Sequence, residues 1–214
     1  MWVITRYGYV EMIGRTMQEF LNQATWTHPP VRSELDGGNL LVEAAQGSDY
    51  WEKTYYGFQR DSGHALLVPI TGDGALEVTF KSSFDGPYDQ AGLMIRTDES
   101  HWIKAGVEFT DEEPHVGAVV TREYSDWSQS AVPEWAHSDV TIRASWTGNS
   151  VVLRARREKE PWRTIRVAHL EITGSTKAGL YLAAPERAGL TVSFSRVSFG
   201  LVDDDLHAQP AALH

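Results

Sequence analysis

The sequence of 214 residues contains no cysteine, and this absence excludes several kinds of chemistry. A chain without cysteine can form neither a disulfide framework nor a cysteine-ligated metal site, and it offers no thiol nucleophile. The lack of disulfides also favours an intracellular compartment. Residues 1–14 do not show the charged start and unbroken apolar stretch of a secretion signal. We therefore expect a cytoplasmic protein.

Long apolar runs are missing as well, and cations are scarce. No stretch of about 18 apolar residues occurs, so we expect no membrane association through a spanning helix. The chain has 29 acidic residues against 19 lysines and arginines, which gives a formal net charge of -10 at pH 7. Because nucleic-acid sites need a surplus of cations, this balance predicts no nucleic-acid partner. Neutral and cationic partners remain open.

The signatures of several enzyme classes and metal sites are also absent. No Gly-x-Ser-x-Gly nucleophile elbow occurs, and the turn at 72–74 lacks the continuation of a phosphate-binding loop. The acidic run at 203–205 lies in the C-terminal tail. Metal-ligand spacing is missing among the histidines that we considered, which are His64, His101, His115, His137 and His169. We therefore expect neither an obligatory metal nor a cofactor.

The chain instead contains a series of short segments in which apolar and polar residues alternate, separated by breaks rich in Gly, Asp, Ser and Pro. Only residues 17–23 invite a short helix. The alternation predicts strands at 40–44, 64–69, 76–81, 91–96, 102–109, 115–121, 140–145, 151–157, 163–169, 178–183 and 190–199. This spacing is typical of a two-sheet antiparallel sandwich, so the predicted fold class is all-β.

No internal repeat or linker divides the chain, and its length suits one large β-domain. Residues 1–16 fit no strand of the later pattern, and residues 201–214 are acidic and then rich in Ala and Pro. We therefore expect a sandwich over residues 17–200 with a peripheral extension at each end. Truncation to Met17 should leave the melting temperature almost unchanged.

The strand predicted at 102–109 has two different faces. Its odd-numbered positions are apolar, whereas its even-numbered positions carry Trp102, Lys104, Gly106 and Glu108. The preceding strand alternates in the same way. We expect one face to pack in the core and the other to be accessible, so that Lys104→Ala should cost little stability. The core face should hold Ile95, Ile103, Ala105 and Val107.

The glycines of these strands fall into one register. A hairpin through 97–101 sets Gly92 opposite Gly106, and a turn at 111–114 sets Gly106 opposite Gly117. Three glycines then line up across three strands. A strip without side chains on a polar face gives a trough about 10 Å across, which suits a flat ligand. The alternative is that each glycine marks a bulge or sheet coiling.

The same register predicts the walls of the trough, with Gln90, Glu108 and His115 on one side and Met94, Lys104 and Val119 on the other. The chain is also rich in aromatic residues, with 8 Trp, 8 Tyr and 7 Phe, and sugar rings stack on such side chains. Core packing is the alternative role of each Trp. The ligand-binding set that we expect is Trp51, Tyr88, Gln90, Gly92, Arg96, Trp102, Lys104, Gly106, Glu108, Gly117, Thr121, Asp126 and Trp127.

Several motifs, in the same order, resemble the family named for the regulation-of-enolase protein. They are the stretch 49–58 with Asp61 and His64, the run 88–96, the Trp-Ile-Lys-x-Gly-x-Glu core at 102–108, the strand end at 119–121 and Ser-Asp-Trp-Ser at 125–128. The resemblance spans about residues 21–199. It implies a jelly-roll sandwich of the concanavalin A-like lectin and glucanase superfamily, and it names no substrate.

Catalysis and binding both remain open. Glu108 with His115 could form an acid–base couple, although the favoured interpretation of His115 is a paired, solvated edge residue. Glu108 with Asp126 or Glu77 could form a glycosidase pair, but the Glu-x-Asp-x-x-Glu string of the superfamily's glucanases is absent. We expect the cations Arg96 and Lys104 to keep Glu108 ionised.

Three functions therefore stay open. The first is lectin-like binding of a carbohydrate or sugar metabolite, and it is favoured because polar and aromatic residues are plentiful whereas no complete catalytic set is recognisable. The second is a sugar-active hydrolase or lyase that uses Glu108 and His115. The third is a regulatory interaction module with a metabolic enzyme as its protein partner, which only the family name suggests.

Overall fold

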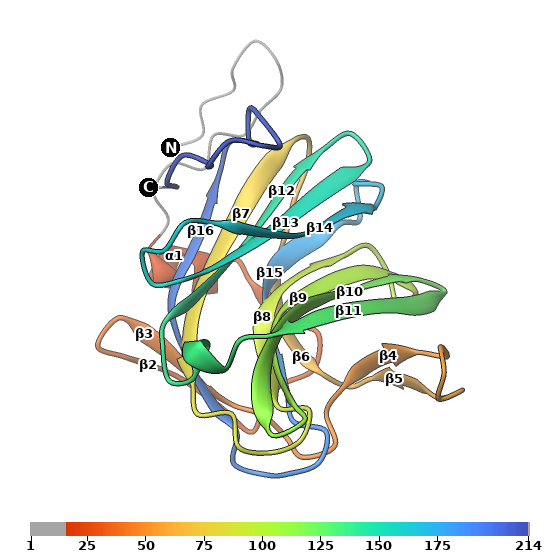
Figure 1. Cartoon of the computed structure of the whole chain (residues 1–214), viewed down its shortest axis with the longest axis vertical. Coiled ribbons are helices and arrows are strands. Elements are labelled where there is room, and N and C mark those ends of the chain that lie inside the picture. Colours follow the sequence, from red (N-terminus) through yellow and green to blue (C-terminus); the bar gives the residue numbers. More distant parts are fainter. Residues whose placement is uncertain (1–15, 214) are drawn as a thin grey trace.

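Two antiparallel sheets pack face to face in the computed structural model, which describes residues 16–213 (Figure 1). The first sheet has the strand order β1 (Thr25–Trp26), β6 (His64–Pro69), β15 (Lys177–Ala183), β8 (Gln90–Arg96), β9 (His101–Thr110), β10 (Glu113–Arg122) and β11 (Tyr124–Ala131). The second has the order β14 (Arg163–His169), β13 (Ser150–Arg157), β12 (Val140–Thr147), β7 (Gly74–Ser82), β16 (Thr191–Gly200), β3 (Asn39–Glu43) and β2 (Arg32–Asp36). The predicted all-β sandwich is confirmed.

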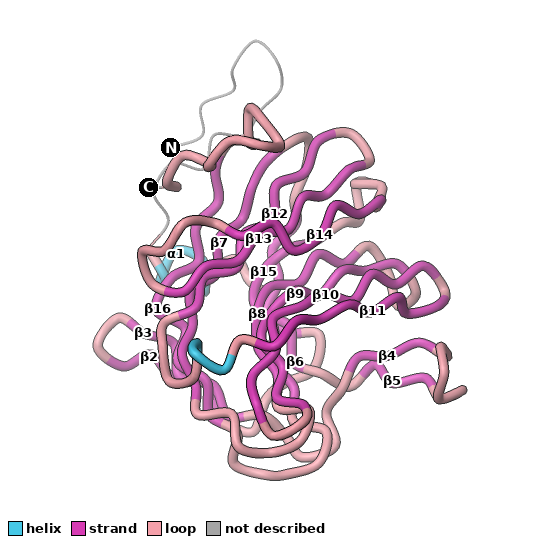
Figure 2. Tube along the Cα trace, viewed as in Figure 1, coloured by secondary structure: helices cyan, strands magenta, loops and turns pink. Residues whose placement is uncertain are grey.

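Three small elements complete the described chain. The hairpin of β4 (Tyr50–Glu52) and β5 (Gln59–Asp61) forms a separate two-stranded sheet. Helix α1 (Met17–Leu21) begins at a capping box between Thr16 and Glu19. A single 3₁₀ turn, η1 (Pro133–Trp135), follows β11. Figure 2 shows how little of the chain is helical.

Every predicted strand corresponds to a strand of the sandwich, but β1, β2, β4, β5 and β11 were not predicted. The strand β2 is exposed along its whole length, and β11 is mostly polar. Both lie at sheet edges, where neither face is fully covered and the apolar alternation that reveals a strand is lost.

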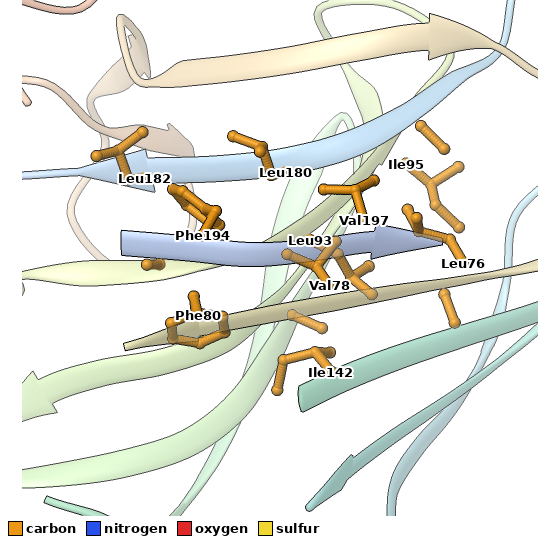
Figure 3. Close-up of a cluster of buried hydrophobic side chains, with 14 of the residues drawn as sticks. Leu76, Val78, Phe80, Leu93, Ile95, Ile142, Leu180, Leu182, Phe194 and Val197 are labelled. Carbon is orange, nitrogen blue, oxygen red and sulfur yellow. The ribbon is translucent and has the colours of Figure 1, made fainter. Parts of the chain in front are cut away.

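The main core lies between the two sheets. Figure 3 shows side chains of both sheets meeting there, among them Leu93 and Leu180 of the first sheet and Phe80 and Phe194 of the second, whose ring centroids are 6.0 Å apart. The predicted core face is confirmed, because the four apolar residues expected there are all buried in this cluster: Ile95, Ile103, Ala105 and Val107. The outer face of β8, β9 and β10 is therefore the face that carries the predicted trough.

The predicted register is also observed. Gly92 pairs with Gly106, and Gly106 pairs with Gly117, so the three glycines lie in a row across β8, β9 and β10. In the same register Gln90 and His115 both pair with Glu108. The register of these three strands could thus be derived from the sequence to the residue.

The outer face is not open as expected, because the β4–β5 hairpin lies against it. Tyr50 and Trp51 of the hairpin pack on Met94, Trp102 and Val119 and form a second, smaller apolar cluster. The backbone amide of Glu52 also donates to Ser125 Oγ at 2.9 Å, which ties the hairpin to β11 (Figure 1). As a result the even-numbered side chains of β9 are largely covered.

Residues 201–213 also pack more closely than the expectation of a peripheral tail implied. Asp203 forms ion pairs with Arg143 of β12 and Arg154 of β13, and Leu213 is buried near Gly200. At the other end, Phe20 of α1 lies 6.4 Å from Phe199, measured between ring centroids. The prediction that residues 1–15 are dispensable falls outside the described residues.

Candidate functional site

A pocket of about 180 Å³ lies between the β4–β5 hairpin and the outer face of the first sheet. Of the three strands that carry the glycine row, only β9 contributes lining residues, which are Lys104 and Glu108. The residues that line it are Asp49, Trp51, Tyr56, Phe58, Arg60, Tyr88, Lys104, Glu108, Trp127, Pro185 and Glu186. Its residues come from five separate parts of the sequence.

Aromatic side chains form one wall of this pocket. The rings of Trp51 and Trp127 are perpendicular, with centroids 6.2 Å apart, and Tyr56 meets Trp51 edge-on at 5.7 Å. Tyr56 in turn stacks on Phe58 at 5.2 Å. The indole N–H of Trp51 donates to the carbonyl of Thr54 at 2.8 Å, which fixes the ring. Trp127 is 37% exposed and remains available to a ligand.

Lys104 supplies a fixed cation at the base of the pocket. Its side chain is almost fully buried, and Nζ donates to Gln90 Oε1 at 2.6 Å and to the carbonyl of Tyr50 at 3.0 Å. Asp49 Oδ1 lies 3.9 Å from Nζ. The expectation that Lys104 is accessible is therefore wrong, since the hairpin covers it. A buried ammonium needs these oxygens to replace its hydration.

Glu108 is the second polar group of β9 in the pocket. Burial raises the pKa of its carboxyl to about 7, an effect that the nearby Lys104 and His115 oppose and Asp49 reinforces. Lys104 does favour the ionised carboxylate, as expected, but desolvation outweighs it and the pKa lies above its usual value. Arg96 does not contribute, since it forms two hydrogen bonds with Asp61 at 2.6 and 2.7 Å.

His115 pairs with Glu108 across β9 and β10 and is buried rather than solvated. Its Nδ1 lies 3.1 Å from the carbonyl of Glu113 and 3.2 Å from Thr110 Oγ1. Because a carbonyl can only accept, Nδ1 carries the proton that this contact requires. Whenever the ring is neutral, Nε2 is the nitrogen left to accept a hydrogen bond.

The glycine row forms a small hollow, not the expected trough. Tyr181 of β15 pairs with Gly92 and its buried side chain fills much of the face, so the hollow between Glu108 and His115 has a volume of only about 10 Å³. That space suits one water molecule. A Cβ on Gly106 would stand 2.0 Å from the carbonyl oxygen of Ala91, so glycine is required there by the close approach of the strands.

Several predicted site residues lie away from the pocket. Trp102 is fully buried with its indole N–H on the carbonyl of Glu99, and Thr121 is buried with its hydroxyl on Ser125 Oγ. Asp126 pairs with Arg166 of β14. It stands opposite Val120, on the core-facing side of the edge strand, so it cannot share a site with Glu108. Glu77, the other candidate for an acid pair, lies in the second sheet and pairs with Arg143.

The part of the chain from 16 to 213 holds no group of three or more His, Asp or Glu side chains arranged to bind a metal ion. Among the same residues, no helix is both long and apolar enough to cross a membrane.

The sequence of this chain is similar to a known protein family. Residues 26–201 match a family described as "Protein of unknown function (DUF1349)". The chain belongs to this family. It is 34% identical over 178 residues to "Regulation of enolase protein 1" of Saccharomyces cerevisiae, a match that covers 83% of the chain and 89% of that protein. The family resemblance predicted from the motifs is confirmed.

A further relative and a solved structure are also similar to this DUF1349 chain. "Uncharacterized protein AN7484" of Emericella nidulans is 28% identical over 181 residues, which cover 79% of the chain and 90% of that protein. The crystal structure of a functionally unknown protein from Saccharomyces cerevisiae superimposes with a TM-score of 0.79 at 32% identity, over 90% of this chain and 99% of that one.

A xylan beta-1,4-xylosidase from Bacillus halodurans C-125 superimposes with a TM-score of 0.66 at 14% identity, over 90% of this chain and 40% of that one. An alginate lyase from Klebsiella pneumoniae gives a TM-score of 0.51, also at 14% identity, over 79% of this chain and 84% of that one. Both likenesses show the sandwich fold alone.

Within this DUF1349 chain, five predicted residues line the pocket, namely Trp51, Tyr88, Lys104, Glu108 and Trp127. Sequence reasoning missed the others, which are Asp49, Tyr56, Phe58, Arg60, Pro185 and Glu186. The density of aromatic residues among polar ones at 49–58 was the available signal for Asp49, Tyr56 and Phe58. No signal marked 185–186, which lie in a loop after β15.

Proposed function

We propose that the pocket beneath the β4–β5 hairpin binds a carbohydrate or a sugar-like metabolite. The observation that carries this proposal is the perpendicular pair of Trp51 and Trp127 beside the buried Lys104 and the half-buried Glu108. Aromatic rings stack on the C–H face of a sugar, while fixed donors and acceptors at the base select its hydroxyl pattern. The sugar-active enzymes that share the fold add an analogy only.

Intrinsic tryptophan fluorescence tests the proposal, because Trp51 and Trp127 both line the pocket. A panel of neutral oligosaccharides, uronates and sugar phosphates should include a compound that quenches or shifts the emission saturably. Trp127→Ala should weaken that binding about tenfold, the loss expected when one stacking contact is removed. The matched control is Val167→Ala, an exposed apolar residue of the second sheet.

Two results would contradict sugar binding. One is the absence of saturable binding to the folded protein across the whole panel. The other is a Trp127→Ala variant that binds as tightly as the parent chain. The name of the yeast relative is what suggests a protein partner for this chain.

A sugar-active hydrolase or lyase is the second candidate, favoured by one observation. Glu108, with its pKa raised to about 7, stands across from His115, so the two groups form an acid–base pair suited to neutral pH. Product analysis of each compound that binds separates the two candidates. If Glu108 acts as the acid or base, Glu108→Gln should lower the rate by about 10² to 10⁴. A binding protein should release no product and lose only part of its affinity in this variant.

A further inference from the structure

The small hollow in the glycine row adjoins the pocket beneath the hairpin. Lys104, Glu108 and Trp127 line both spaces. The hollow has a volume of about 10 Å³, which is enough for one oxygen atom with its hydrogens. It is therefore a recess of the pocket, and a single small group of a bound ligand fits into it.

Tyr181 forms one end of this recess because of its place in the sheet. Tyr181 pairs with Gly92, and Gly92 with Gly106, so that a row begins on β15 and crosses β8 and β9. The row continues through Gly117 of β10 to Gln129 of β11 (Figure 1). Gly106 and Gly117 line the recess, whereas Gly92 does not. The glycines thus leave room for the long side chain of Tyr181, which covers Gly92 and brings its hydroxyl to the recess.

The hydroxyl of Tyr181 has no partner among the described residues, although the side chain is only 3% exposed. It is not one of the polar atoms that are closed off from solvent without a partner, so it keeps some accessible surface, and the recess is where Tyr181 is exposed. By contrast, the hydroxyl of Tyr50 bonds to Thr27 Oγ1 at 2.7 Å and to the carbonyl of Gly63 at 2.6 Å. A buried hydroxyl without a protein partner is costly unless water or a ligand supplies one.

The other side chains of the recess complement this hydroxyl. Gln129 Oε1 accepts a hydrogen bond from Thr110 at 3.2 Å, which leaves the amide N–H groups of Gln129 as donors. His115 Nε2 and the carboxylate of Glu108 are acceptors. The recess therefore offers donors from Tyr181 and Gln129 and acceptors from the other two. A hydroxyl, which donates and accepts at once, matches this set.

The charges of the pocket disfavour an anionic group. Three acidic and two basic side chains line it, those of Asp49, Glu108, Glu186, Arg60 and Lys104. Both cations lie beside the same acid, since Asp49 is 3.5 Å from Arg60 and 3.9 Å from Lys104. A carboxylate or phosphate of a ligand would meet the remaining negative charge of Glu108 and Glu186. The ligand that fits is therefore neutral.

We propose that the recess binds one hydroxyl of a neutral sugar and that Tyr181 is the residue that selects it. This inference rests on the proposed sugar binding and names the class of sugar. A hydroxymethyl group suits the recess, because it projects one bond further from the ring than a ring hydroxyl does. It enters the recess while the ring stays against Trp127. The class is thus a neutral hexose unit, in preference to a 6-deoxy sugar or a uronate.

Matched sugars isolate this hydroxyl. The probes are the methyl glycosides of glucose, galactose and mannose, each with its 6-deoxy and uronate counterparts. Tryptophan fluorescence is titrated at about pH 8, where Glu108, with a pKa of about 7, is mainly ionised. The hexoside that binds should do so about fivefold more tightly than its 6-deoxy counterpart, the effect of one net hydrogen bond, and the uronate should bind more weakly still.

Tyr181→Phe should abolish the preference for the hexoside over its 6-deoxy counterpart, because it removes the hydroxyl and keeps the ring. Tyr124→Phe is the matched control, since Tyr124 is exposed on β11 and lines neither the recess nor the pocket. It should keep the full preference.

Thermal unfolding separates recognition from a structural role. Tyr181→Phe should melt within about a degree of the parent chain, because its hydroxyl bonds to no described residue. Tyr50→Phe, which loses two hydrogen bonds, should melt a few degrees lower. An equal loss in both variants would show that the Tyr181 hydroxyl holds the fold together, and it would overturn the proposal.

Two binding results would overturn this inference and leave sugar binding intact. One is a preference for the hexoside that is absent in the parent chain or survives in Tyr181→Phe. The other is a uronate or a sugar phosphate that binds more tightly than every neutral hexoside. If no sugar of any kind binds, the proposed function and this inference both fail.

Discussion

Two side chains of β9, Lys104 and Glu108, give the pocket its electrostatic character, and Gly106 separates them. Both point away from the core, yet neither is freely hydrated, because the β4–β5 hairpin covers this face. Lys104 remains paired with oxygens of Gln90 and Tyr50. Glu108 has no such set of donors, and this difference explains why burial dominates its titration.

Glu108 should make stability depend on pH. Its pKa is raised from 4.5 to about 7, so between these values the folded state holds a proton that the unfolded state has released. Stability should therefore fall as the pH rises from about 4.5 to 7, by at most about 3 kcal/mol. Urea unfolding from pH 4.5 to 8 measures this change. Glu108→Gln should lack it, whereas the exposed control Glu171→Gln should behave as the parent chain.

Lys104→Ala should destabilise the fold by about 2 to 5 kcal/mol, because it leaves Gln90 Oε1 and the carbonyl of Tyr50 without their donor. That range is similar to the cost expected for Ile103→Ala in the core. It should also raise the pKa of Glu108 further, since Lys104 lowers it. Chemical denaturation with the exposed Lys177→Ala as control measures the loss. Equal stability of the two lysine variants would contradict the role of Lys104.

At the scale of elements, the outer face of the first sheet depends on how closely β8, β9 and β10 approach one another. The row of Gly92, Gly106 and Gly117 permits this approach, because a Cβ at each position would collide with backbone of the next strand. The glycines thus shape the face from below, while the hairpin closes it from above. The pocket lies between the outer face of these strands and the hairpin.

Gly106→Ala should therefore cost several kcal/mol, in contrast to the tolerance expected from a strand exposed on one face. The added Cβ would lie 2.0 Å from the carbonyl oxygen of Ala91, and strand backbone cannot yield as a flexible side chain can. Gly174→Ala is the control, since its Cβ meets nothing within 4 Å. Thermal unfolding should show a large loss for the first variant and almost none for the second. A near-parental Gly106→Ala would contradict this packing.

At the scale of the whole molecule, charged side chains join segments that are distant in the sequence. On the outer face of the second sheet, Arg143 is held by Glu77 of the same sheet and by Asp203 of the C-terminal segment. Arg154 donates to Asp203 and to the carbonyl of Leu206. The segment 201–213 thereby covers the buried arginines of two strands.

Asp203→Asn should destabilise the fold by about 3 to 5 kcal/mol, because it leaves two buried guanidinium groups without a shared carboxylate. The adjacent and exposed Asp204→Asn should change stability little. The melting temperatures of both variants measure the difference. If they are equal, the C-terminal segment contributes nothing to the fold and is peripheral, as the sequence had suggested.

The sequence by itself determined the sandwich, most of its strands and the register of the central strands, because alternation and turn residues act between neighbours along the chain or across one hairpin. It also identified Trp51, Lys104, Glu108 and Trp127. Only the tertiary structure decided that the hairpin of 50–61 covers the glycine row, that Asp126 faces away from Glu108, and that burial outweighs cations at Glu108. These facts depend on contacts and solvent exclusion between distant segments, which no local pattern records.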